Sequence, residues 1–245
     1  MQNDLPNNAA ALSTIWVYLS QTPLLWLTVT LIAYWIADTI SRKANRQPLL
    51  NPVVLAAGSI IVILQFSGTE FEIYFEGAQF VHFLLGPATV ALAVPLYRNL
   101  PKVTSRLSPM LVALAAGSTT AIVSAVAIAW SFGVPNDVLV SLAPKSVTTP
   151  IAMGIAEELG GIPTLAAVLV IATGIFGAIV VTPLMNALNI KDFAARGFAV
   201  GIASHGIGTA RAFQVSPLAG TFAGIAMGLN GAFTALLVPL MASLF

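Results

Sequence analysis

The stretch LAPKSVTTPIAMGIAEELGG, residues 142–161, combines a lysine, two adjacent glutamates, two prolines and several hydroxyl side chains within about one helix length. It stands between long apolar runs in a chain that otherwise avoids charge. Hydrophobic residues make up 58% of the 245 residues and charged residues only 8%, whereas soluble domains carry roughly 25% charged residues. The composition therefore predicts a membrane protein rather than a soluble domain.

Uncharged runs that reach the roughly 20 residues of a bilayer-crossing helix occur along the whole chain. From these runs and their prolines we expect spans at 14–38, 51–67, 79–97, 108–132, 162–188, 195–213 and 217–244, with 138–158 left open. The expected fold is an all-α polytopic membrane protein of about seven to eight membrane segments, some of them discontinuous or re-entrant. We expect one domain, 1–245, whose tail 1–13 lies outside the cytoplasm and lacks the basic residues of a removable signal peptide.

The positions of the basic loops predict how the chain is oriented in the membrane, but the loop that contains Lys191 and Arg196 fits this orientation only if 138–158 is not a full crossing. The loops 39–50 and 98–107 hold six of the ten basic residues, and basic loops prefer the cytoplasm, so the N-terminus is expected outside. A full crossing by 138–158 would place Lys191 and Arg196 outside, against this preference, whereas a re-entrant segment returns them inside. The prolines and glycines favour a helix that breaks near Thr148–Pro150. Such breaks are tolerated where the backbone is buried in protein or lines a wet cavity. A kinked full span remains the alternative.

A weak internal similarity points in the same direction. PATVALAVPLYRNL (87–100) aligns with SVTTPIAMGIAEEL (146–159), and GSTTAIV (117–123) aligns with GIFGAIV (174–180). Small residues also recur by chance in membrane helices, which is the other explanation. A true inverted repeat would be typical of transporters, which place discontinuous helices at the repeat interface near the membrane midplane.

Four charged residues lie outside the tail, the loops and the span ends: Lys145, Glu157, Glu158 and Arg211. All four belong to the opening stretch or to GIASHGIGTARAF (201–213). A charge at mid-bilayer costs a few kcal/mol and usually marks a path for substrate or ions. Three simpler interpretations remain open, in which Arg211 snorkels to the interface, Lys145 lies at the membrane surface and the glutamates form a solvated helix end.

The two polar stretches supply the candidate substrate-binding residues. If 201–213 is one helix, Ser204, Gly208 and Arg211 share a face, while His205 and Thr209 pair on the next strip. Cations, hydroxyls and helix N-terminal amides suit a small carboxylate. The candidate substrate-binding residues are Lys145, Ser146, Thr148, Thr149, Pro150, Ser204, His205, Gly206, Gly208, Thr209 and Arg211. The candidate proton-coupling residues are Glu157 and Glu158.

Several chemistries are not expected. The chain has no cysteine, which excludes thiol catalysis and cysteine-bound zinc. Its two histidines, His82 and His205, lack the spacing of a metal-binding motif, and a net charge of +1 gives no basis for nucleic-acid binding. We therefore expect no enzymatic activity, no metal and no cofactor.

The two polar stretches closely resemble the signature stretches of the LrgB/CidB family, and FLLGPATVALAVPLY (83–97) is similar to a third. The resemblance covers roughly residues 20–245. It extends to the plant plastidic glycolate/glycerate transporter, in which such a module follows an LrgA-like one. The resemblance implies a separate LrgA/CidA-like, holin-like membrane protein as a partner, because this chain has no LrgA-like half.

The resemblance implies two functions of different classes. One is a secondary transporter of small monocarboxylates such as glycolate, glycerate, pyruvate or lactate across the bacterial inner membrane, with the carboxylate held by Lys145 and Arg211 and with possible coupling to protons. The other is an antiholin-like regulator of murein hydrolase export and cell lysis; a channel is a further alternative. Embedded cations favour transport, and two-fold symmetry, which dominates homo-oligomers, favours a homodimer or a higher oligomer.

Overall fold

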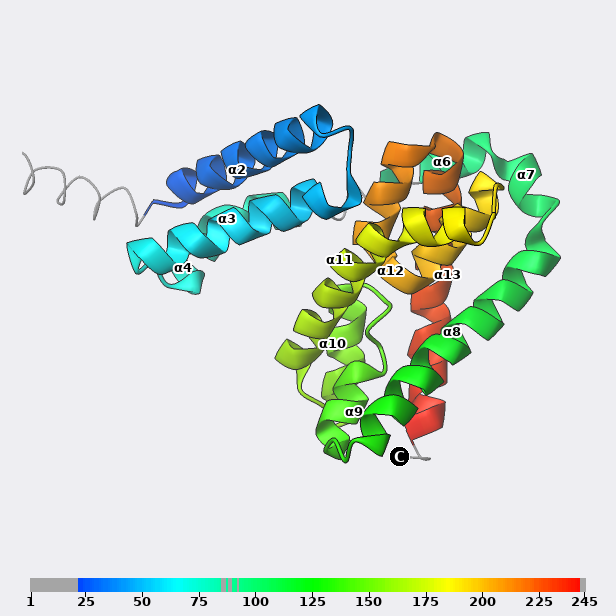
Figure 1. The fold of residues 1–245 in the computed structure, drawn as a ribbon. Coiled ribbons are helices and arrows are strands. Elements are labelled where there is room, and N and C mark those ends of the chain that lie inside the picture. Colours follow the sequence, from blue (N-terminus) through cyan, green and yellow to red (C-terminus); the bar gives the residue numbers. More distant parts are fainter. Residues whose placement is uncertain (1–21, 85–86, 88–89, 92, 243–245) are drawn as a thin grey trace, which may run out of the picture. The chain divides into compact units, whose positions relative to one another are not determined.

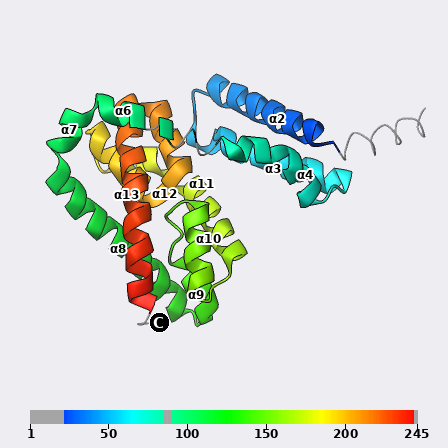
Figure 2. The ribbon, with the colours of Figure 1, turned by 180° about the vertical axis from the view of Figure 1, so that it is seen from behind.

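The computed structural model describes residues 22–84, 87, 90–91 and 93–242, and every regular element within these ranges is a helix (Figures 1 and 2). The chain forms two compact units, Met1–Val90 and Ala91–Phe245. Four helices in the described ranges are long and apolar enough to cross a membrane: Pro23–Lys43, Leu107–Ser131, Pro163–Ala187 and Pro217–Met241. The chain is therefore an all-helical, polytopic membrane protein.

The first unit contains α2 (Pro23–Lys43), the short 3-10 helix η1 (Pro48–Leu50), α3 (Pro52–Ser67) and α4 (Phe71–Phe83). Helix α2 packs against both α3 and α4. Gly77 permits the close approach of α4, because a Cβ atom there would lie 2.2 Å from the carbonyl oxygen of Pro23. Trp26 is wholly buried and meets Tyr74 edge-on, with ring centroids 5.9 Å apart.

The expected spans 51–67 and 79–97 leave residues 68–78 as a connection, but the structure has a helix there from Phe71 onward. Helix α3 ends at Gly68, whose left-handed backbone (φ 63°) terminates it, and α4 begins three residues later. The acidic residues Glu72 and Glu76 lie on the exposed face of α4. The expected span 79–97 falls partly outside the described residues, and its described parts include the end of α4 and α6 (Ala93–Arg98).

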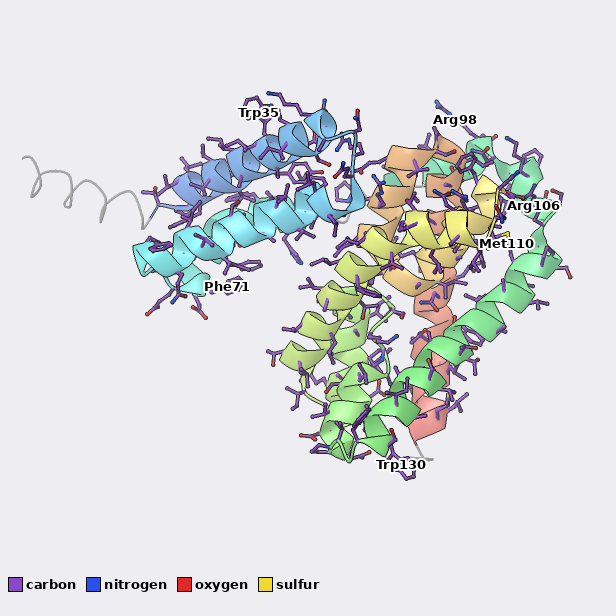
Figure 3. The ribbon with its side chains drawn as sticks, viewed as in Figure 1. Trp35, Phe71, Arg98, Arg106, Met110 and Trp130 are labelled. Atoms are coloured by element: carbon purple, nitrogen blue, oxygen red, sulfur yellow. The ribbon has the colours of Figure 1, made fainter. Side chains whose placement is uncertain are left out.

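The second unit contains α6, α7 (Leu100–Thr104), α8 (Leu107–Ser131), α9 (Asn136–Leu142), α10 (Thr149–Glu158), α11 (Pro163–Ala187), α12 (Phe193–Val215) and α13 (Pro217–Ala242). Its long helices expose large apolar side chains such as Val112, Trp130, Phe176 and Leu236. Such a surface fits lipid tails rather than water. Arg98 and Arg106 lie at one end of this unit, and Trp130 lies at the other (Figure 3).

Residues 136–161 form a helix hairpin, here called hairpin 1, in which the chain after α10 returns to α9. Helix α9 stops at Leu142, residues 143–148 are not helical, and α10 begins at Thr149. The backbone N–H of Ile162, just after the hairpin, donates to Ser141 Oγ in α9 at 2.7 Å. The chain therefore turns back on itself, and the predicted break near Thr148–Pro150 is confirmed.

The helices on either side of hairpin 1 run in opposite directions. Arg106, directly before α8, pairs at 2.6 Å with Asp192, which follows α11 and is the N-cap of α12. Since α8 and α11 each have 25 residues, hairpin 1 starts and ends at the opposite end of the unit. The basic residues Arg98, Lys102, Arg106, Lys191 and Arg196 thus gather at one end, the basic end. The acidic residues Asp137, Glu157 and Glu158 lie at the other, the acidic end.

Residues 193–215 form a second hairpin, hairpin 2, so the prediction of a straight span at 195–213 is wrong. Backbone angles are non-helical at Ser204 (φ −133°) and at His205 (φ 39°, ψ −132°) inside α12. The two halves of α12 lie against each other, because Ala212 and Val200 belong to one buried cluster and a Cβ on Gly208 would meet Val200 and Ser204. Hairpin 2 therefore enters from the basic end and returns to it, where α13 begins.

The two hairpins occupy opposite ends of the unit and reach towards its middle. In Figures 1 and 2, α9 lies near the C-terminal end of α13, whereas α12 lies towards the start of α13. Glycines permit the tight packing of hairpin 2, since a Cβ on Gly197 or Gly201 would lie 2.0 or 2.2 Å from a carbonyl oxygen of α13. This packing brings the tips of both hairpins to the middle of α8, α11 and α13.

Candidate functional site

The non-helical tip of hairpin 1 presents Lys145 and Ser146 to a cavity of about 350 Å³. Lys145 is partly buried, and its Nζ donates to the carbonyl oxygen of Ala121 at 3.4 Å and to Ser146 Oγ at 3.3 Å. Within the described residues no carboxylate lies within salt-bridge distance of Lys145. The lysine at this tip therefore has only neutral oxygens around its charge.

The tip of hairpin 2 contributes Ser204 to the same cavity. Ser204 is 1% exposed, and its Oγ has no hydrogen-bond partner among the residues that the structure describes. Burying a hydroxyl without a partner costs free energy. An unpaired hydroxyl beside a partly buried ammonium group makes this part of the cavity suited to an anion.

His205 fixes hairpin 2 against α11. Its Nε2 lies 3.0 Å from the carbonyl oxygen of Val170, and its own carbonyl accepts a hydrogen bond from Thr209 Oγ1 at 2.8 Å. The bond from Thr209 reaches the backbone of His205 and does not join the two side chains, so their pairing stays a prediction. A Cβ added to Gly174 would lie 2.7 Å from the His205 ring, and one added to Gly177 would lie 1.7 Å from Ser204 Oγ. Two glycines of α11 therefore provide the space for the tip.

The structure brings together only part of the predicted site. Arg211 lies in the second half of α12, where it lines a separate small pocket with Arg196 and donates to Gln214 Oε1 at 3.3 Å. The predicted clamp of Lys145 and Arg211 around one carboxylate is not formed in this conformation, because the hairpin turns Arg211 back towards the basic end. The remaining predicted residues, which lie at or near the two breaks, are Thr148, Thr149, Pro150, Gly206 and Gly208.

The predicted proton-coupling residues lie away from the cavity. Glu157 and Glu158 are exposed at the end of α10, roughly 13 Å of helix from its start at Thr149. The prediction depended on a desolvated carboxylate beside the cavity, and both side chains instead face outward at the acidic end. They also do not balance the charge of Lys145.

Asn230, near the middle of α13, is a central polar residue that the sequence reasoning missed. It is 1% exposed, and its Nδ2 donates to the carbonyl oxygens of Ser146 and Ile202, each at 3.1 Å. Its Oδ1 accepts from Ser118 Oγ at 2.5 Å and from Thr234 Oγ1 at 3.3 Å. The signal in the sequence was an uncharged but strongly polar amide inside the apolar run 212–245.

A second, larger cavity of about 610 Å³ adjoins the first. Both cavities are lined by Ala121, Ala199 and Ala203, and the larger one extends along α8 and α12 to the Arg106–Asp192 pair. Partial burial alone would raise the pKa of Asp192. The hydrogen bonds from Arg106 and from the Ala194 backbone N–H outweigh this and hold the pKa below its ordinary value.

The sequence profile of the LrgB-like family matches residues 30–244. This chain belongs to the LrgB family. The holin-like protein CidB of Staphylococcus epidermidis is 32% identical to it over 221 residues, which are 90% of this chain and 96% of the relative. The CidB of Staphylococcus aureus is 30% identical over 91% of this chain and 96% of its own length. The uncharacterized protein YxaC of Bacillus subtilis is 34% identical over 87% and 93%. No solved structure matches the chain.

Proposed function

We propose that this LrgB family member transports a small monocarboxylate across the bacterial inner membrane through the site between its two hairpin tips. The observation that carries the proposal is the meeting of Lys145 and Ser204, from hairpins that enter at opposite ends, on one cavity. Secondary transporters build their substrate sites in this way, from discontinuous helices near the membrane midplane.

The lining of the site suggests what it binds. An ammonium group that is partly buried beside neutral oxygens gains most from an anion. The hydroxyls of Ser146 and Ser204, which line the cavity, can donate hydrogen bonds to a carboxylate. Lys145 is the one cation among the lining residues of the described cavity, while Phe176, Val180 and Leu184 make another part apolar. A ligand with one negative charge and a short carbon chain fits such a cavity, and glycolate, glycerate, pyruvate and lactate are ligands of this kind.

The two halves of the second unit support an inverted repeat. α8 followed by hairpin 1, and α11 followed by hairpin 2, each combine a 25-residue helix with a returning hairpin, and they start at opposite ends. The similar segments 117–123 and 174–180 occupy nearly the same place along α8 and α11. The similarity of 87–100 to 146–159 lies partly outside the described residues. Such symmetry is the usual basis of alternating access, in which the site opens first to one side and then to the other.

The basic end supports an orientation. Because basic residues prefer the cytoplasm, we place the basic end of the second unit inside and hairpin 1 on the outside. The larger cavity, which shares three alanines with the site, would then lead from the cytoplasm to Lys145 past the Arg106–Asp192 pair.

A second function is favoured by the names of the relatives, which describe CidB as holin-like. By name, these relatives fit an antiholin-like regulator of murein hydrolase export and lysis better than a carrier of a particular acid. In that function the chain acts with an LrgA/CidA-like membrane protein, and the tips of the hairpins need not bind substrate. A homodimer or higher oligomer is compatible with either function.

Uptake into proteoliposomes separates the two functions. The purified chain is reconstituted alone and together with an LrgA/CidA-like protein, and the uptake of labelled glycolate, glycerate, pyruvate and lactate is measured. Saturable uptake of one of them that is lost in Lys145→Met but kept in Lys102→Met, which changes an exposed lysine of α7, supports transport. Absence of uptake for all four acids, with and without the second protein, contradicts the proposal and leaves the regulatory function.

A further inference from the structure

We propose that Asn230 is a positioning residue that holds the tips of both hairpins in the closed arrangement, in which both tips are buried next to α13. Its Nδ2 donates to Ser146 in the tip of hairpin 1 and to Ile202, two residues before the break of hairpin 2. Ser146 and Ile202 are 56 residues apart in sequence, and their carbonyl oxygens share one amide group as donor. Asn230 thus joins two segments that enter the unit from opposite ends.

The carbonyl oxygens that Asn230 binds lie in the break of hairpin 1 and two residues before the break of hairpin 2. A helix that stops leaves its last carbonyl groups unsatisfied, and a buried unsatisfied carbonyl is costly. Both tips can therefore move away from Asn230 only if they find new donors. Because both depend on the same amide, loss of that amide loosens both tips together.

The other two hydrogen bonds of Asn230 hold its amide in orientation. Ser118 in α8 and Thr234 in α13 both donate to Oδ1, which turns Nδ2 towards the two tips. Removing either hydroxyl leaves both donated bonds in place. The chain thus offers matched control variants that alter the same polar cluster but keep the proposed connection.

Thiol labelling tests the proposal independently of transport, because the chain has no native cysteine. Ser146→Cys and Ser204→Cys report on the two tips, which are buried in the closed arrangement. Thr221→Cys, buried near the start of α13, reports on the rest of the unit. Labelling rates are measured on the full chain in detergent, in the parent and with Asn230→Leu, Asn230→Asp, Ser118→Ala or Thr234→Val added.

Because the two tips share one amide and open together, the loss of its two hydrogen bonds of ordinary net strength in Asn230→Leu should raise the labelling rate of both tip cysteines roughly 30-fold. Ser118→Ala and Thr234→Val should raise the labelling rate of the tip cysteines about fivefold or less. The labelling rate of Thr221→Cys should stay the same in all of these variants. Asn230→Asp keeps the size and Oδ1 but loses the amide hydrogens. Asn230→Asp should therefore also raise the labelling rate of both tip cysteines, and it replaces the leucine variant in the test if that variant does not fold. No acceleration, acceleration of one tip alone, or an equal acceleration of Thr221→Cys would overturn the proposal.

Discussion

Arg106 and Asp192, 86 residues apart, form an ion pair of 2.6 Å that brings the start of α8 next to the start of α12, in the segment that follows α11. This pair requires residues 136–161 to enter and leave the membrane on one side. Single cysteines at Asp137 and Glu158, both exposed, should therefore be labelled from the same side of sealed vesicles. A cysteine at Lys191 should be labelled from the opposite side. Labelling of Asp137→Cys and Glu158→Cys from different sides would show a full crossing instead.

The same pair makes stability depend on acid pH. The pKa of Asp192 is lower in the folded protein than in the unfolded chain, where it is about 3.9. Its contribution to stability is thus fully present above pH ~4 and is lost as the pH falls through the folded value. Because the pair is exposed, the contribution is expected to be about 1 kcal/mol or less.

Melting temperatures of the purified protein measured against pH check this expectation. Asp192→Asn retains an oxygen that can cap α12 through the Ala194 N–H but removes the charge. The parent should melt a few degrees higher than this variant at neutral pH, a shift of the size that about 1 kcal/mol produces, and the difference should vanish at low pH. A difference that stays constant from neutral to acid pH would contradict the assignment.

His205 carries backbone strain that a glycine would relieve. Its φ of 39° and ψ of −132° lie in a region that glycine alone adopts without cost. His205→Ala loses the bond to Val170 and keeps the strain, whereas His205→Gly loses the bond and relieves it. We expect the glycine variant to be about 1–2 kcal/mol more stable than the alanine variant in thermal unfolding. At Ala210, which lies within a helix, alanine should be more stable than glycine, and Ala210→Gly should lower the free energy of unfolding by about 1 kcal/mol.

The contact of Gly177 with Ser204 predicts a steric test of the site. A Cβ at Gly177 would lie 1.7 Å from Ser204 Oγ, whereas a Cβ at Gly228 would meet nothing within 4 Å. Gly177→Ala should displace the tip of hairpin 2 and cost about 1–3 kcal/mol, with loss of carboxylate binding. Gly228→Ala should be neutral or slightly stabilising. Equal behaviour of the two variants would mean that the tip does not pack against α11 as described.

The sequence predicted the parts of the fold that local physics determines. The expected spans 108–132 and 162–188 differ from α8 and α11 by one residue at each end, because charged residues and prolines end these apolar runs. The break in hairpin 1 was predictable because prolines and a lysine interrupt it. Ser204 and Lys145 were recognised by their polarity in an apolar setting.

Hairpin 2 and Asn230 could not be derived in this way. Residues 193–215 have the length of a span, and their reversal depends on one strained residue, His205, held by distant glycines of α11. Arg211 was assigned to the face of Ser204 by assuming a continuous helix. Asn230 has no charge that would mark it in the sequence, and three of its four hydrogen bonds join α13 to segments that are far away in sequence.

The most direct test of the account is the equilibrium binding of glycolate and pyruvate to the purified protein, measured by calorimetry in detergent. If the carboxylate lies at Lys145, then Lys145→Met should weaken binding about 10- to 150-fold, the loss expected for one charged hydrogen-bonding partner. The exposed control Lys102→Met should bind like the parent. Binding by Lys145→Met that equals the parent, in a variant that is folded, would contradict the central claim that the hairpin tips form the substrate site.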